Sequence, residues 1–368
     1  MMNSNRSFFG SLRFAGIVMA ALAALSAFPH AQAVPPAPAA PAAAPRVTNV
    51  SILHLNVTNL AQSLALYRDV LGMELTAPLA APRAGGALVS EPGGMLQTTV
   101  LRVPGGTFSM ELVEWTGIPL RPQQARIQDP GAIMLALFVR DLDAKLAGVK
   151  RLGLKVLTTN GEPFVSEGRG GGRNRAVMVR DPSGFIVELE ETVGAPAGGA
   201  PLPPGPISSV AIWLTVQDLA QTVNFYNRVF GFTLPAAAEA RPAPERIKAL
   251  FGDTSLATVR MARGTFPGTE TGINFQEFGG PDRKPVRHRV QDPGGPIFTM
   301  TAPDFPAVID GVRANGGIIG DGATSATLAP DARASWVRDP NGLLIRLSAP
   351  QPPRGGGAAP AAAPQGGR

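Results

Sequence analysis

Three residues place a reactive side chain inside an apolar, strand-like segment: His54 in SILHLNV, Glu111 in FSMELVEW and Glu188 in IVELE. Side chains alternate between the two faces of a strand, so Glu188 points away from its apolar neighbours Val187 and Leu189. An imidazole and two carboxylates can ligate a divalent metal. A carboxyl group in apolar surroundings also acquires the raised pKa that suits a general base. We therefore predict His54, Glu111 and Glu188 as catalytic residues or as metal ligands.

Composition excludes several other kinds of chemistry. The 368-residue chain has no cysteine, which rules out disulfides, thiolate metal sites and cysteine nucleophiles. Apart from His30 near the N-terminus, only His54 and His288 remain, too few to propose a Ser/His/Asp set. His288 stands among basic residues in a segment that we expect to be a solvated loop. The net charge of +6 is modest and lacks the basic stripe or arm of nucleic-acid-binding proteins, so we predict no nucleic-acid partner.

The N-terminus has the three parts of a secretory signal peptide. Arg6 and Arg13 precede or flank an unbroken run of apolar and small residues at 14–28, and Ala31-Gln32-Ala33 forms a cleavage site. This run of 15 residues is shorter than the roughly 18 that a membrane span requires. We predict removal of residues 1–33, a secreted or periplasmic mature protein, and no membrane association after cleavage.

Segments rich in Pro, Ala and Gly divide the mature chain into two blocks. A linker at 34–46, a second linker at 194–206 and a tail at 350–368 leave the blocks 47–193 and 207–349. The blocks repeat one another: LAQSLALYRDVLGMEL matches LAQTVNFYNRVFGFTL, RIQDPG matches RVQDPG, and VRDPSGFIVEL matches VRDPNGLLIRL. Three matches in the same order at nearly constant spacing indicate a duplicated domain.

Each block has two halves with the same order of elements. In block one, strands at 51–57 and 133–139 lead into helices at about 60–71 and 142–152. Asn59 and Asp141 are suitable N-caps, and Gly72 and Gly153 suit the C-terminal turns. Further strands are expected near 97–103, 107–115, 174–180 and 185–190. Each block is therefore predicted to be βαβββ twice.

These motifs carry a family resemblance. The helix ends YRDVLGMEL and YNRVFGFTL, with the closing DPSGFIVEL and DPNGLLIRL, resemble the vicinal oxygen chelate superfamily, which includes glyoxalase I, bleomycin and fosfomycin resistance proteins and extradiol dioxygenases. The resemblance implies an α+β fold of two tandem glyoxalase-like domains, each a pair of βαβββ modules forming a cupped mixed sheet. It also implies a small-molecule ligand inside the cup and allows a homodimer.

The resemblance places four metal-ligand positions in block one at Ile52, Glu111, Met134 and Glu188. Isoleucine has no donor atom, and a thioether suits soft metals rather than the divalent ions of this family. His54 lies two residues from the Ile52 position on the same face. A divalent metal in block one would therefore use Glu111, Glu188 and His54. The equivalent positions of block two do not form a donor set: Ala211, Asn274, Ile297 and Arg346.

Alternation also predicts side chains that line the cups without being reactive. In block one these are Asn56, Trp115 and Met134. In block two, Trp213 and Arg346 would bring an indole and a guanidinium together, which suits a flat or carboxylated ligand. Glu190 ends a strand and is expected to be exposed, and Tyr67 lies on the apolar stripe of its helix.

Three functions follow as alternatives. The first is an exported protein that binds a small organic molecule in the cup of block one, with lyase or isomerase activity carried by Glu111, Glu188 and His54. The second is a non-catalytic binding or sequestering protein of the drug-resistance type that uses both cups. The third is a metal-dependent lyase or dioxygenase with atypical ligands. The sequence leaves open the ligand, the metal, a site in block two, and whether the blocks pair with each other or with a second chain.

Overall fold

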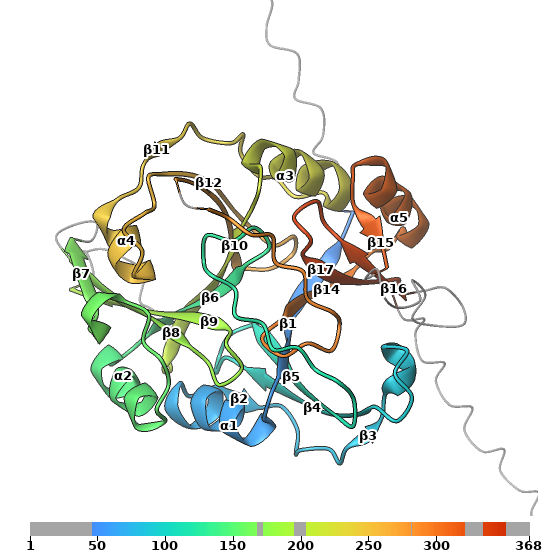
Figure 1. The fold of residues 1–368 in the computed structure, drawn as a ribbon, viewed down its shortest axis with the longest axis horizontal. Coiled ribbons are helices and arrows are strands. Elements are labelled where there is room, and N and C mark those ends of the chain that lie inside the picture. The colour runs from blue at the N-terminus through green and yellow to red at the C-terminus, as the bar shows by residue number, and fades with distance from the viewer. Residues whose placement is uncertain (1–45, 168–171, 195–203, 281, 321–333, 351–368) are drawn as a thin grey trace, which may run out of the picture. The chain divides into compact units, whose positions relative to one another are not determined.

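A computed structural model describes residues 46–167, 172–194, 204–280, 282–320 and 334–350 (Figure 1). The predicted signal peptide, nearly all of the first linker and the C-terminal tail lie outside these ranges. Within the described residues the strands form two mixed sheets, which we call sheet A and sheet B. No helix in these ranges is long and apolar enough to cross a bilayer.

Block one contributes two modules. The first contains β1 (Thr48–Val57), α1 (Leu60–Leu64), the π-helical turn η1 (Ala65–Val70), β2 (Glu74–Leu75), β3 (Arg83–Ala84), the 3-10 turn η2 (Gly86–Leu88), β4 (Met95–Arg102) and β5 (Ser109–Thr116). The second contains β6 (Ile133–Val139), α2 (Leu142–Arg151), the 3-10 turn η3 (Thr159–Gly161), β7 (Phe164–Glu167), β8 (Arg173–Arg180) and β9 (Ile186–Val193). The strands and helices predicted for this block agree with these bounds to within three residues.

Block two repeats the order with one addition. Its first module contains β10 (Ile207–Thr215), α3 (Leu219–Phe225), the π-helical turn η5 (Tyr226–Phe230), β11 (Arg241–Pro242), α4 (Glu245–Phe251), β12 (Thr258–Thr265) and β13 (Gly272–Gly279). Its second contains β14 (Pro296–Thr301), α5 (Phe305–Ala314), β15 (Ile318–Ile319), β16 (Ala334–Arg338) and β17 (Leu344–Ser348). The sequence interpretation had no helix at the position of α4.

Each sheet combines one module from each block. Sheet A has the order β15-β16-β17-β14-β1-β5-β4-β2, with β3 beside β4, and sheet B has the order β11-β12-β13-β10-β6-β9-β8-β7. The modules therefore pair across the blocks, an arrangement that the sequence had left open. The seams are antiparallel pairs, β1 with β14 and β6 with β10. Six of the seven side chains of β6 are buried, and pairing it on both edges leaves none of its backbone groups on an open edge.

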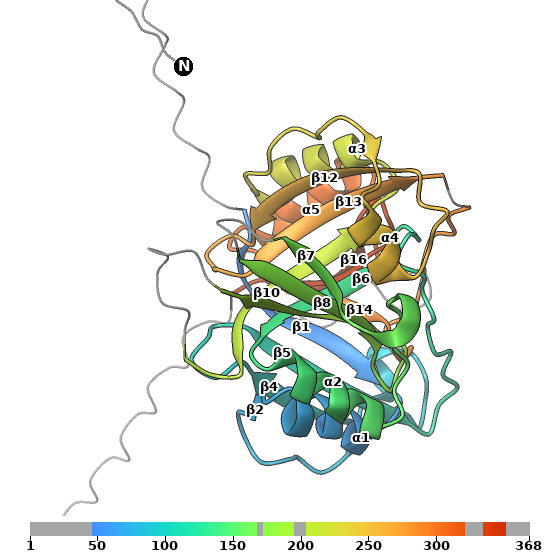
Figure 2. The same ribbon diagram turned by 90° about the vertical axis from the view of Figure 1, so that its left-hand side faces the viewer.

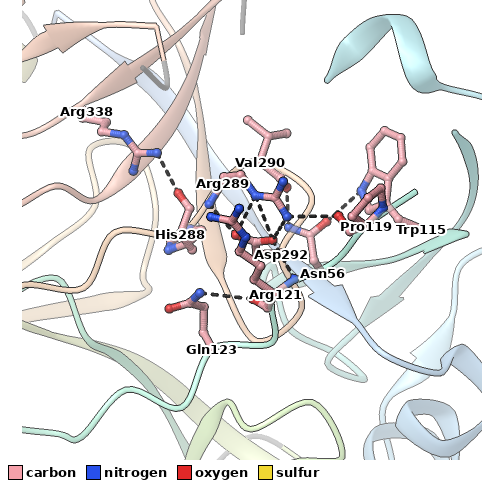
Figure 3. A network of polar contacts seen from close by, with 10 residues as sticks. All are labelled: Asn56, Trp115, Pro119, Arg121, Gln123, His288, Arg289, Val290, Asp292 and Arg338. Carbon is pink, nitrogen blue, oxygen red and sulfur yellow. Dashed lines mark hydrogen bonds and ion pairs between the residues drawn. The ribbon is translucent and has the colours of Figure 1, made fainter. Parts of the chain in front are cut away.

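Two segments pass between the sheets and carry the repeated RIQDPG and RVQDPG motifs. In the segment between β5 and β6, Asp129 accepts a hydrogen bond from the backbone N–H of Lys284, at 2.9 Å. In the segment between β13 and β14, Asp292 pairs with Arg289 and accepts from the backbone N–H of Arg121, at 3.0 Å (Figure 3). The repeated motifs thus fasten the two crossing segments to each other.

Helices and buried tyrosines hold the two modules of a block together. The predicted caps are confirmed, because Asn59 and Asp141 accept from backbone N–H groups of the first helical turn. Helix α2 contacts η1, and α5 contacts η5; Figure 2 shows α2 beside α1, the helix that η1 continues. Tyr67, which is fully buried, donates to Asp181 at 3.0 Å, in the turn between β8 and β9 of the other module. Burial raises the pKa of Asp181 to about 6, although Tyr67 and backbone N–H groups donate to it.

Candidate functional site

The inner face of sheet B and helix α4 line a cavity of about 430 Å³. Its apolar lining comes from both blocks: Met134, Phe138, Ile247, Leu250, Phe251 and Met261. Its charged lining consists of three acids and three arginines: Glu167, Glu188, Glu190, Arg241, Arg246 and Arg263. A concave, mostly apolar space with a few convergent polar groups is typical of a small-molecule site. The cavity therefore belongs to neither block alone.

Glu188 is the buried acid of this cavity. It lies on β9 beside Ala136 of β6 and Met178 of β8, and only 4% of its surface is exposed. Burial and, to a smaller extent, the nearby carboxylate of Glu190 raise the pKa of Glu188, Arg246 opposes them, and the net value is about 7. At neutral pH the carboxyl group is therefore present in both protonation states.

Arg246 reaches into the cavity from α4. Its Nη2 lies 3.1 Å from Glu190 Oε2 and 3.6 Å from Glu188 Oε1. Its Nη1 donates to Ser166 Oγ on β7, at 3.0 Å. The arginine thus connects α4 to two strands of the other block and partly neutralises the two acids. Glu190, whose side chain is only 12% exposed, is not the solvent-facing residue that we expected from its place near the strand end.

Trp213 and Arg263 form a second polar feature of the cavity. Trp213 lies on β10 opposite Met134, and the guanidinium carbon of Arg263 lies 5.5 Å from the centre of the Trp213 rings. The sequence interpretation placed an arginine beside this indole but chose Arg346, which lies on β17 in sheet A. Strand alternation identifies an inward face, whereas the neighbour across the sheet depends on which modules pair.

His54 and Glu111 lie together in sheet A. They are register neighbours on β1 and β5, and His54 Nδ1 is 3.1 Å from Glu111 Oε2. Burial acts to raise the pKa of Glu111, but the hydrogen bond and charge of His54 and the charges of Arg346 and Arg83 bring it below its usual value. Glu111 is thus a stabilised carboxylate, unlike Glu188.

Asn56 and Trp115, both predicted to contact a ligand, belong to a packed polar network behind this pair. Trp115 donates to Asn56 Oδ1 at 3.1 Å, and Asn56 donates to the carbonyl oxygen of Val290 at 2.7 Å (Figure 3). Both side chains are buried, and Trp115 shares an apolar cluster with Ile297 and Trp336. Their observed contacts join β1 and β5 to the crossing segment of block two.

The residues at the predicted metal positions do not fit a divalent metal. Glu188 is in sheet B, so it does not join His54 and Glu111, whose sheet A counterparts are Ile297 and the cationic Arg346. In sheet B, Glu188 is accompanied by Met134, Ala211 and Asn274. Among the residues that the structure describes, no group of three or more His, Asp, Glu or Cys side chains could hold a metal ion. The predicted set of Glu111, Glu188 and His54 is not assembled, because the modules pair across blocks.

Strand alternation identified Glu188, Met134 and Trp213 as inward-facing, and all three line the cavity. It missed Arg246 and Arg263. Arg263 is on a strand that the interpretation did not assign, and Arg246 is on α4. The segment APERIKALFG has a proline before the first helical turn and a glycine after the last, which is a recognisable signal for a short helix.

Comparisons with known proteins bear on the fold and the family. A family model described as the Glyoxalase/Bleomycin resistance protein/Dioxygenase superfamily matches residues 48–189 and 207–347, which correspond to the two blocks. A relative, 2-epi-5-epi-valiolone epimerase from Actinomyces sp, is 30% identical over 148 residues, covering 39% of this chain and 80% of that protein. These matches confirm the predicted resemblance and the tandem α+β organisation.

Two solved structures of glyoxalase I mutants from Zea mays are each 17% identical to this chain. One has a TM-score of 0.50 and covers 81% of this chain and 91% of its own. The other has a TM-score of 0.48 and covers 81% of this chain and 92% of its own. At this level of identity the likeness to the first of these structures concerns the fold alone.

Proposed function

The chain belongs to the glyoxalase/bleomycin resistance protein/dioxygenase superfamily, and on that premise we propose that it binds a small organic molecule in the sheet B cavity and moves a proton through Glu188, as an isomerase or lyase. One observation carries the proposal: a buried carboxyl group with a pKa of about 7 forms part of the cavity wall. Catalytic acids and bases operate best with a pKa near the working pH.

The surroundings of Glu188 suit proton transfer to and from carbon. A carboxylate in an apolar wall can take a proton from a C–H bond next to a carbonyl group and return it to the same or a neighbouring atom. Arg246 on α4 forms ion pairs with both acids and lowers the free-energy cost of the charged form of Glu188. The relative from Actinomyces sp is named as an epimerase, a type of isomerase, which supports this reaction type over the alternatives.

Proton exchange tests the proposal without knowledge of the natural substrate. The chain 34–368 is incubated in D₂O with a panel of small 2-oxo acids and cyclic hydroxyketones, and loss of C–H signals is followed by proton NMR. We expect Glu188→Gln to slow exchange by roughly 10²- to 10⁴-fold with an unchanged melting temperature. The control is Glu162→Gln, which alters an exposed acid paired with Lys150.

Equal exchange by wild type and Glu188→Gln would remove Glu188 from the reaction. Binding of panel compounds without exchange in the wild type would favour the non-catalytic binding protein.

We also infer from the sequence that residues 1–33 direct export and are removed. The support is the arrangement of Arg6, Arg13, the apolar run and the Ala31-Gln32-Ala33 site. N-terminal sequencing of the protein recovered from outside the cytoplasm should begin at Val34. A chain that keeps its first residues after expression would contradict this inference.

A further inference from the structure

The three arginines of the sheet B cavity differ in whether an acid is paired with them. Arg246 is shared between Glu188 and Glu190. Arg241 and Arg263 also line the cavity, and no ion pair joins either of them to an acid within the described residues. Within the described part of the chain, the cavity thus holds two guanidinium groups that have no acid as a direct partner.

Arg263 is the better placed of the two to bind an anion. It stacks over Trp213 at 5.5 Å from the ring centre, which orients a planar group that is otherwise mobile. Within the described residues its other polar contact is with Met261 Sδ, at 3.7 Å, and a thioether is a weak acceptor. Most N–H groups of its planar fork therefore remain available to an acceptor with two oxygens.

The cavity keeps such an anion away from its acids. Arg263 pairs in register with Asn274, which pairs with Trp213, and Trp213 pairs with Met134. The Arg263 guanidinium lies over Trp213 on β10, and Glu188 is on β9, so two strand spacings separate them, roughly 10 Å along the sheet. The same cavity is also lined by apolar side chains, which can contact the body of a ligand. A ligand whose anionic group contacts Arg263 would therefore extend an apolar body toward Glu188.

We propose that the ligand of this cavity is a compact organic carboxylate with a flat, largely apolar body, and that Arg263, stacked on Trp213, binds its carboxylate. This inference rests on the proposed function, since it concerns the same cavity. It assigns the anion-binding role to Arg263 and leaves Glu188 to face the remainder of the ligand.

Matched acids and amides test the proposal. The probes are benzoate and benzamide, cyclohexanecarboxylate and its amide, and 3-phenylpropanoate and its amide, titrated into the chain 34–368 at pH 8 by isothermal calorimetry. We expect each acid to bind roughly 10- to 100-fold more tightly than its amide, as for hydrogen bonds to a charged group. Arg263→Gln should abolish this preference. The control Arg313→Gln, which alters an exposed arginine on α5 paired with Asp310, should retain it.

The contrary outcomes are distinct. The inference is overturned if none of the six probes binds, if acids and amides bind equally, or if the preference survives in Arg263→Gln. Loss of the preference in Arg241→Gln but not in Arg263→Gln would also overturn the assignment. If acids still bind more tightly than amides but no proton exchange is found, the proposed reaction is wrong and the role of Arg263 stands. If exchange is found but acids and amides bind equally, the proposed reaction stands and the role of Arg263 is wrong.

Discussion

At the scale of single residues, effects of opposite sign bring the pKa of Glu188 close to neutral pH. Burial has the largest influence and raises its pKa, Glu190 raises it too, Arg246 lowers it, and the net value is about 7. Glu111, in the other sheet, has the opposite balance, because the partnership with His54 outweighs burial. Two carboxyl groups that looked equivalent in the sequence thus have different protonation behaviour, and Glu188 is the one that suits proton transfer.

Substitutions at the two neighbours of Glu188 should move its pKa in opposite directions. Glu190→Gln removes a like charge and should lower the pKa of Glu188, whereas Arg246→Gln removes a favourable charge and should raise it. If Glu188 acts as the base, its exchange activity rises with pH through this pKa, so the profile moves to lower pH in Glu190→Gln and to higher pH in Arg246→Gln. Carbon-13 NMR of labelled glutamate carboxyls measures the same shift directly. Shifts in the same direction would contradict the arrangement.

At the scale of elements, the crossing segment of block two is more buried at His288 than its sequence suggested. His288 lies in the segment between β13 and β14 and is only 2% exposed, so the expectation of a solvated loop is wrong. Its ring is close to Gly295, where an added Cβ would meet the imidazole at 2.4 Å, and Arg338 donates to its carbonyl oxygen (Figure 3). Burial and, to a smaller extent, the charge of Arg338 lower the pKa of His288 to about 4, although Asp292 opposes them.

The buried imidazole should make stability depend on pH. Its pKa is about 4 in the folded protein and near the ordinary 6.5 in the unfolded chain, so between these values the unfolded state binds more protons. Stability is therefore lost as pH falls through this window. Between pH 7 and pH 5 the wild type should lose about 2 kcal/mol more unfolding free energy than His288→Leu. Urea unfolding of both proteins at both pH values measures this difference, and equal losses would show that His288 titrates normally.

At the scale of the whole molecule, helices and strands connect the modules in different ways. Strand pairing joins modules from different blocks, through β1 with β14 and β6 with β10. Helix contacts and the Tyr67–Asp181 hydrogen bond join modules of the same block, and Tyr226 and Asp339 repeat this bond in block two. The pairing that the sequence left open is thus satisfied within one chain. The predicted homodimer of the full chain stays a prediction.

A single block should therefore associate with a copy of itself. Residues 47–193 alone would leave β1 and β6 without their partners on one edge, and an open, apolar strand edge is a template for pairing with another chain. We expect light scattering after size-exclusion chromatography to give twice the mass of the fragment. Replacing the β6 residue Leu135, which is buried, with Lys should weaken the dimer. A monomeric fragment that unfolds cooperatively would contradict this account.

Much of the fold could be predicted from local sequence patterns. The repeated motifs predicted the duplication, and caps such as Asn59 and Asp141 placed the helix starts correctly. Alternation also put Glu188, Met134 and Trp213 on inward faces. These features depend on residues within a few positions of one another, because a strand's two-residue period and a helix's first turn are local properties.

The neighbours of these residues were decided only by the tertiary structure. Alternation determines which face a side chain occupies, but not which strand lies next to its own. His54 on β1 pairs in register with Ile297 on β14, and Trp213 on β10 with Met134 on β6. Such pairings depend on how four similar modules fit together, and any two of them present comparable edges. The sequence by itself therefore determined the modules and their inward faces, whereas the assembly of modules decided that Glu188 meets Arg246 rather than His54 and Glu111.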